Sequence, residues 1–165
     1  MAETFTSELG NAIEAVIKAR GAEYIPGFAP RNVFFYHDDE IVQGGQCPAI
    51  GILFRGWNRV KDSCRGHNAD GTVAPGYALL TFRFDVHIWQ SASKPGALES
   101  LIKTWADGIT AILEDQYSLG GESVDVNVDA TNQLQQLEIG GNLLAVMPIN
   151  LSISCFKLQG AVTLP

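Results

Sequence analysis

The chain has 165 residues, of which 46% are apolar and 18% are charged. With 11 Lys and Arg against 18 Asp and Glu, its formal net charge is −7. This balance argues against a protein whose main task is to bind nucleic acid or an anionic membrane, because both tasks use clustered Lys and Arg. The apolar content excludes a disordered chain. The length predicts a single domain, residues 1–165, and so few charges are typical of a protein that covers surface with other subunits.

The N-terminal part is predicted to form a helix followed by a loop and a short strand. Apolar residues recur every three or four positions over residues 4–20, which is the pattern of an amphipathic helix. They are Phe5, Leu9, Ala12, Ile13, Val16 and Ile17. We expect Gly21 to end this helix. Residues 21–32 read as a loop, and residues 32–36 as a strand because of their aromatic and β-branched content.

The middle of the chain predicts two strands. Pro48 opens the first, with Ile50, Ile52 and Phe54 on one side. Residues 58–76 show no periodicity, and we expect a long loop or hairpin insertion there. Residues 77–90 form the clearest strand, since strict alternation over ten residues buries one face. Its apolar face is Leu80, Phe82, Phe84, Val86 and Ile88, and its polar face is Thr81, Arg83, Asp85, His87 and Trp89.

A second amphipathic helix is predicted over residues 94–117, ended by Gly120 and Gly121. Its stripe is Leu98, Leu101, Ile102, Trp105, Ile109, Ile112 and Leu113. Residues 124–128 alternate valines with Asp125, Asn127 and Asp129, as a half-buried strand does. Residues 131–139 are expected to pair with that strand. Gly140, Gly141 and Asn142 form a hairpin turn before the last strand, residues 143–157. That strand has Ala145, Met147, Ile149, Leu151, Ile153 and Cys155 on one face.

These elements predict an α+β fold: a two-layer sandwich in which two amphipathic helices cover one face of a mostly antiparallel sheet. The other face of the sheet is expected to be polar and free to meet neighbours. Arg83, Asp85, His87, Trp89, Asp125 and Asp129 are the candidate residues of this polar face.

No residue pattern points to catalysis. None of the common nucleotide-binding, hydrolase or metalloprotease motifs is present, and we expect no enzyme activity and no cofactor. His37, Asp38, Asp39 and Glu40 form the densest run of possible metal ligands, but a solvated turn explains them better because neighbouring side chains of an extended segment point in opposite directions. A zinc site at Cys47, Cys64 and His67 lacks the second close pair of ligands that structural sites use. A small metal-binding enzyme is the least favoured hypothesis.

One cationic segment stands out against the negative net charge. Four of the 11 cations, with Trp57 and His67, fall close together: Arg55, Arg59, Lys61 and Arg65. A nucleic-acid patch and a loop that docks on an acidic neighbour are both consistent with this pattern. We favour the docking loop, because a nucleic-acid site would work against the field of the whole chain.

The order of elements, with several local segments, resembles the bacteriophage tail terminator (tail completion) proteins. The segments that carry the resemblance are residues 48–54, 82–89, 98–113, 115–121, 124–128 and 145–155. The likeness extends over residues 5–157 and rests on pattern, and the insertion at 58–76 is longer than the minimal fold of that family.

The resemblance implies a structural virion protein that forms a hexameric ring at the head-proximal end of the tail tube. Such a ring stops tube polymerisation and offers the surface on which a neck or connector protein joins, and in contractile tails it also meets the sheath. Another head–tail connector or a tube-like protein is the alternative. DNA would pass through the lumen without specific binding, and Asp125 and Asp129 are the candidate lumen carboxylates. The expected site of assembly is the host cytoplasm, with no membrane involved.

Overall fold

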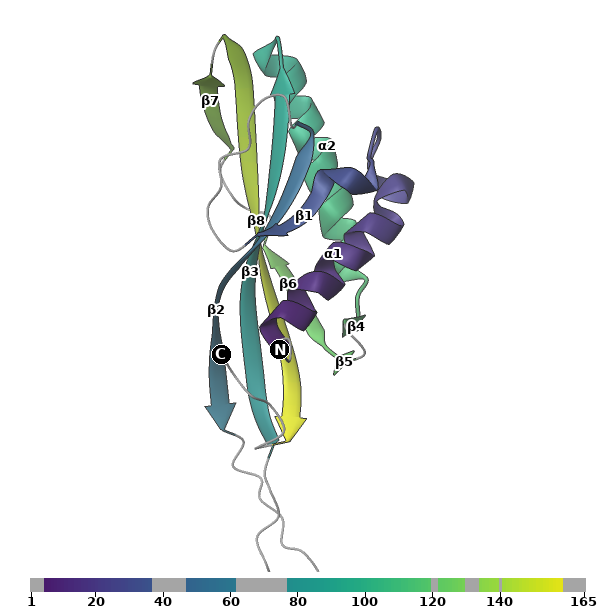
Figure 1. Cartoon of the computed structure of the whole chain (residues 1–165), viewed down its shortest axis with the longest axis vertical. Coiled ribbons are helices and arrows are strands. Elements are labelled where there is room, and N and C mark those ends of the chain that lie inside the picture. Colours follow the sequence, from purple (N-terminus) through teal and green to yellow (C-terminus); the bar gives the residue numbers. More distant parts are fainter. Residues whose placement is uncertain are drawn as a thin grey trace, which may run out of the picture.

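The computed structural model describes residues 5–36, 47–61, 77–119, 122–129, 134–139 and 141–158. They form two layers, with two helices packed on one face of a sheet (Figure 1). The predicted α+β sandwich is confirmed. The helices are α1 (Phe5–Tyr24), the short 3-10 helix η1 (Pro30–Asn32) and α2 (Pro95–Glu114). The strands are β1 (Val33–Tyr36), β2 (Ala49–Lys61), β3 (Tyr77–Ala92), β4 (Ser118–Leu119), β5 (Glu122–Ser123), β6 (Asp125–Asp129), β7 (Gln135–Ile139) and β8 (Asn142–Leu158).

The main sheet has six strands in the order β1-β2-β3-β8-β6, with β7 also paired to β8. The β1–β2 pair is parallel, and all other pairs of this sheet are antiparallel. Because β3 occupies one side of β8 along its length, β6 and β7 follow one another along the other side. Three long strands, β2, β3 and β8, therefore form the centre of the sheet and extend beyond the helices (Figure 1).

The core lies between the helices and the sheet, as the alternation predicts. All five apolar residues of β3 are at most 1% exposed, as are most of the stripe on α2. Cys155 is buried at 3% exposure on the same side of β8, which agrees with the prediction of a small core residue. Leu101 is the exception on α2, at 37% exposure. At about 100° per residue it lies about 60° from Leu98 around the helix, at the margin of the stripe.

Gly21 does not end the first helix, which continues to Tyr24. A Cβ atom on Gly21 would lie 2.4 Å from the ring of Phe28, so the missing side chain makes room for that ring. The prediction failed because glycine is used for helix ends and for close approach alike. The left-handed residue that follows the helix is Gly27, with φ +72°.

Two other element boundaries and one strand pairing differ from the prediction. Helix α2 ends at Glu114, before the expected 117, and a two-stranded sheet of β4 and β5 follows. Strand β7 pairs with β8 through the predicted turn at Gly141, rather than with the strand at 124–128. Strand β2 continues to Lys61, so the first four residues of the segment 58–76 are strand. The remainder, residues 62–76, lies outside the described residues.

Candidate interaction surface on the outer face of the sheet

The outer sheet face, defined as the face opposite α1 and α2, brings together the predicted polar residues of distant segments. Paired residues of neighbouring strands share a face. The register places Asp85 beside Asn150, and Asn150 beside Asp129. Two further rows cross the sheet in the same way: Arg83, Ser152 and Asn127, and then Thr81, Ser154 and Asp125. Thus Arg83, Asp85, Asp125 and Asp129 lie on one face, as the alternation predicts.

Asp85 is the centre of a charged group on this face. Arg55 donates a hydrogen bond from Nε to Asp85 Oδ2 at 2.6 Å, and His87 Nε2 lies 3.8 Å from the same oxygen. Burial raises the pKa of the Asp85 carboxyl, but the His87 imidazole and the hydrogen bond and charge of Arg55 outweigh it, so the pKa lies below its ordinary value. Asp85 is therefore a carboxylate at neutral pH.

A hollow of about 310 Å³ opens beside this group. Its lining is Arg55, Arg83, Phe84, Asp85, Asn127, Asp129, Asn150, Leu151 and Ser152. Ser152 has the one hydroxyl group among these described lining residues, and no histidine lines the hollow. It offers hydrogen bonds and charges of both signs, which suits recognition of a polar protein surface better than acid–base chemistry.

Asn127, Asn150 and Ser152 were not among the sequence-based candidates. The alternation of residues 124–128 and 143–157 already places them on the polar side of their strands. What the sequence did not supply is the register that sets these two strands beside β3.

The prediction that Trp89 belongs to the polar part of the outer face is wrong. Its side chain is only 6% exposed and belongs to a small apolar cluster with Ala49, Leu144 and Val146. The ring of His87 meets the ring of Trp89 edge-on, at 6.4 Å between centroids. The outer face is therefore apolar near Trp89 and polar along the three rows that contain Thr81, Arg83 and Asp85.

A β-bulge divides the predicted cationic loop between two faces of the sheet. The register shifts between Phe54 and Gly56, where Gly56 has φ +140°. Gly56 opposes Arg83, and Arg55 is the bulged residue, whose side chain reaches Asp85 on the outer face. Beyond the bulge, Trp57 pairs with Phe82 and Arg59 with Leu80 on the helix side. The expectation that Arg55, Trp57, Arg59 and Lys61 lie in a loop is wrong, because all four belong to β2. Arg65 and His67 lie outside the described residues.

Most residues of the two hypothetical metal sites lie outside the described part of the chain. His37, Asp38, Asp39 and Glu40 are not described, nor are Cys64 and His67. Within the described ranges, no three His, Cys, Asp or Glu side chains are close enough to hold a metal ion. Burial raises the pKa of the Cys47 thiol, although a hydrogen bond with Ser91 acts in the opposite direction.

None of the described helices is long and apolar enough to span a membrane.

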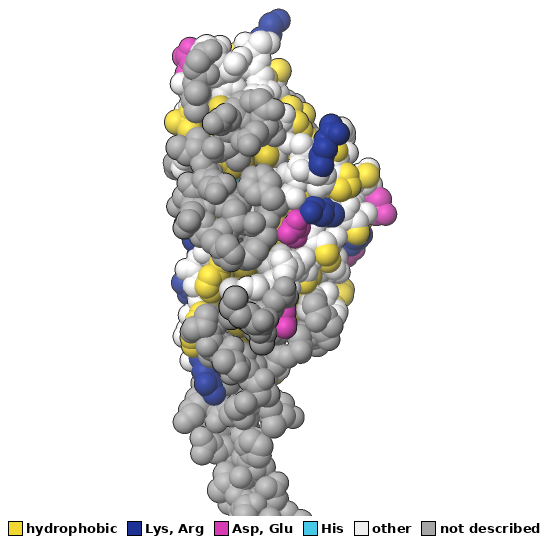
Figure 2. Space-filling model, in the orientation of Figure 1, with side chains coloured by type: hydrophobic (Ala, Val, Ile, Leu, Met, Phe, Trp, Pro, Cys, Tyr) yellow, Lys and Arg dark blue, Asp and Glu magenta, His cyan; other side chains and the backbone are white. Residues whose placement is uncertain are grey.

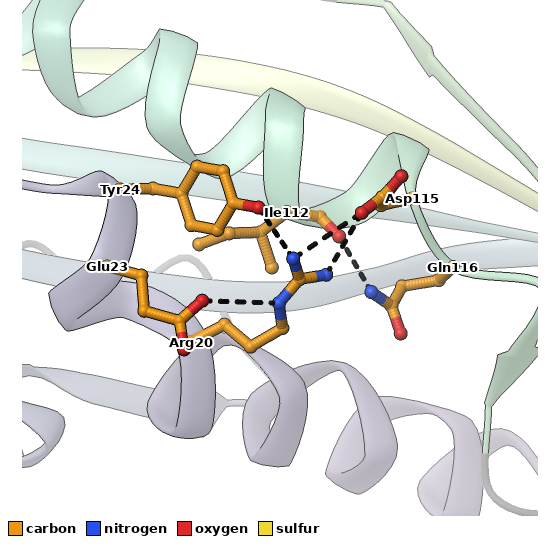
Figure 3. A network of polar contacts seen from close by, with 6 residues as sticks. All are labelled: Arg20, Glu23, Tyr24, Ile112, Asp115 and Gln116. Atoms are coloured by element: carbon orange, nitrogen blue, oxygen red, sulfur yellow. Dashed lines mark hydrogen bonds and ion pairs between the residues drawn. The ribbon is translucent and has the colours of Figure 1, made fainter.

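A polar network on the helical layer joins the ends of α1 and α2 (Figure 3). Arg20 donates to Asp115 Oδ2 through Nη1 and Nη2, each at 3.4 Å, and to the Tyr24 hydroxyl at 2.6 Å. Glu23 Oε2 lies 3.9 Å from Arg20 Nε. Glu23 and Asp115 are more than 60% exposed, at 65% and 63%. Such exposed ion pairs contribute little to stability. The network is therefore interpreted as a contact that orients α1 relative to α2.

Solved structures that share this fold include chains of two phage-like particles. A chain of the native gene transfer agent virion aligns with a TM-score of 0.50 and 9% identity, over 90% of this chain and 96% of that chain. The sheath/tube terminator of an extracellular contractile injection system aligns with a TM-score of 0.50 and 13% identity. That alignment includes 100% of this chain and 61% of the terminator chain, which is therefore considerably longer. No protein-family model and no curated protein sequence matches the chain.

The structural class of this chain is thus defined by its fold. The chain has the α+β sandwich that is found in a virion chain and in a contractile-injection terminator. At 9% and 13% identity the likeness concerns architecture alone, and the roles of those proteins remain their own.

Proposed function

We propose that this protein is a structural component of a phage-like tail, and that it forms a ring which caps the head-proximal end of the tail tube. The observation that carries the proposal is the shared fold: 90% of the chain aligns with a virion chain and 100% with a tube terminator. The sequence resemblance to tail terminators points in the same direction. The proposed location is the tail of the virion.

The proposed ring acts through contacts between complementary surfaces, and this role requires no catalysed reaction. A closed ring requires that one patch on each subunit meet a different patch on the next. Its two rims then meet different partners, the tail tube on one side and a neck or connector protein on the other, with the sheath added in a contractile tail. A hexamer is the proposed ring size.

DNA is proposed to pass through the lumen without specific binding. The outer sheet face carries Asp85, Asp125 and Asp129 against Arg55 and Arg83, a mixed surface with a slight excess of negative charge. Phosphates are bound by clusters of Lys and Arg, which this face does not provide. Asp125 and Asp129 remain the candidate lumen carboxylates.

A second candidate function is another head–tail connector or a tube-like protein. The comparison that favours it is the gene transfer agent chain, which is identified only as part of a virion.

The test is to add the purified protein to tail-tube protein of the same phage while the tube polymerises, and to measure tube lengths and end occupancy by electron microscopy. The proposal predicts tubes that stop growing, with one ring at one end. Tubes that grow without limit and carry no ring would overturn it. Polymerisation of the protein itself, or binding to the portal side alone, would replace it with the second candidate.

A further inference from the structure

Two strands on opposite sides of the sheet, β2 and β7, have free edges among the described strands. Strand β1 pairs with Ile50–Leu53 of β2 only, so no described strand pairs with β2 on that side from Phe54 to Lys61. On the other side, β7 pairs with β8 and with no other described strand. Figure 1 shows β7 at one end of the long sheet and the free part of β2 at the other. Such edges present N–H and C=O groups that can pair with another chain.

The two edges carry opposite charges on the same face of the sheet. Arg59 pairs with Leu80 and Glu138 pairs with Leu143, and both leucines pack in the core between sheet and helices. Paired residues share a face, so Arg59 and Glu138 both lie on the helix side. Both are exposed, and neither makes an ion pair with another described residue. Figure 2 shows acidic side chains at the upper left of the molecule and basic side chains at the lower left.

Exposed apolar residues accompany these charges on the outer face. Leu137 of β7 pairs with Leu144, a member of the small apolar cluster on that face, and is 44% exposed. At the free part of β2, one row of the register contains Val60, Leu79 and Phe156, and Phe156 is 63% exposed. Edge strands are commonly protected by Lys or Pro, and β7 contains neither. Each edge is therefore suited to a contact that covers apolar surface.

One register satisfies the charges and the apolar residues together. Three antiparallel pairings separate β2 from β7, so β2 of one copy beside β7 of another, with both sheets facing the same way, forms an antiparallel pair. Setting Arg59 opposite Glu138 sets Val60 opposite Leu137. Unlike charges then meet on the helix side, and Leu137 extends the apolar row on the outer face; both kinds of cross-strand pair are favourable.

This contact offsets neighbouring copies along their strands. Glu138 lies at the level of Ala92 of β3, whereas Arg59 lies at the level of Leu80, twelve residues away along the same strand. The offset is about 40 Å at about 3.3 Å per residue. An unshifted contact is not available, because β2 has only begun at the level of β7 and β1 covers the residues that follow. A closed ring would therefore have strands inclined to its axis, as the strands of closed barrels are.

Only contact between unlike edges is complementary. Two β2 edges side by side would bring the arginines at position 59 together, and two β7 edges would do the same with Glu138; like charges in cross-strand pairs are unfavourable. A contact between two different patches repeats from copy to copy, as a ring requires. Asp125 and Asp129 belong to β6 and take no part in it, so the candidate lumen carboxylates stay uncovered.

We infer that residues 58–61 of β2 in one copy pair with residues 136–139 of β7 in the next copy, with Arg59 opposite Glu138. The sheet is thereby continued from subunit to subunit. This inference rests on the proposed ring and names its lateral contact. The partner is a second copy of this chain, identified by charge, by sheet face and by strand direction.

The experiment reverses the two charges singly and together in the full chain. The variants are Arg59→Glu, Glu138→Arg and the double variant, which restores an unlike pair with the signs exchanged. Arg31→Glu and Asp125→Arg are the matched controls; each reverses one exposed charge, and Asp125 lies on β6, the other strand that pairs with the same side of β8. Circular dichroism selects folded protein. Sedimentation velocity measures self-association, and electron microscopy measures ring occupancy at the ends of tail tubes.

Each single edge variant should associate at least about fivefold more weakly than the wild type, because a like pair replaces an unlike pair at every contact. The double variant should recover the wild-type association, and both controls should retain it. Single variants that assemble normally, a double variant as weak as the single ones, or an equal loss in Asp125→Arg would each overturn the inference. A wild-type ring at tube ends would still support the proposed function in those cases. A wild type that forms no ring, alone or on tail tube, would overturn both.

Discussion

Gly108 of α2 offers a direct test of how closely the two helices pack. A Cβ atom added there would lie 2.6 Å from Ile25 Cγ1 and 3.0 Å from the backbone oxygen of Tyr24. Ile25 is only 2% exposed, and the second contact is main chain, so neither can move freely. We expect Gly108→Ala to cost about 1–3 kcal/mol through overpacking. Gly96, in the first turn of the same helix, has nothing within 4 Å of its Cβ position and is the matched control.

Both substitutions improve helix propensity, by up to about 1 kcal/mol each, and comparison of the two variants removes most of that shared gain. Gly108→Ala should therefore melt below Gly96→Ala by about 2–12 °C, since 1 kcal/mol shifts the melting temperature of a chain of this size by about 2–4 °C. Thermal unfolding followed by circular dichroism measures the difference. Equal melting temperatures would show that α1 and α2 do not approach as closely at this glycine as the structure indicates.

Two further predictions concern the sheet. Phe84 is fully buried and packs against Phe54 at 5.4 Å between ring centroids, so Phe84→Ala should cost about 3–5 kcal/mol in denaturant unfolding; an unchanged midpoint would contradict the register of β3. The lowered pKa of Asp85 means that its charged form stabilises the fold above its ordinary value of 3.8, and that this stabilisation is lost as the pH falls further. Asp85→Asn should therefore be less stable than the wild type by about 0.5–1 kcal/mol at pH 7, with Arg55 partly exposed, and the gap should close in acid. A stability difference that is as large in acid as at pH 7 would refute the assignment to Asp85.

The periodicity of the chain predicts the layers well, because burial on one face leaves a clear trace in sequence. The alternation in β3 and the stripe on α2 both mark residues that prove to be buried. Helix ends are harder to predict from sequence. Gly21 follows the last apolar residue of the stripe, as a helix-ending glycine does, and only the position of the Phe28 ring shows why it lies inside α1. The partner of β7 is likewise a matter of register and of the turn at Gly141, which sequence spacing alone does not decide.

The candidate surface is predictable in part. Alternation places Arg83, Asp85 and Asp129 on the polar side of their strands, and the structure sets these strands beside one another. The distribution of the cationic residues depends on the bulge at Gly56, which turns Arg55 and Arg59 to different faces. Glycine inside a strand is a known signal of a bulge, but the sequence gives no rule for which residue it displaces. The burial of Trp89 depends on contacts that a single strand pattern does not contain.

We propose that this protein acts as a ring at the end of a tail. Cryo-electron microscopy of tails isolated from the phage, with the protein located by an antibody or a fused tag, tests it most directly. We expect a single closed ring of six copies at the head-proximal end of the tube and nowhere else. Tails that lack the protein, or copies spread along the tube, would contradict it.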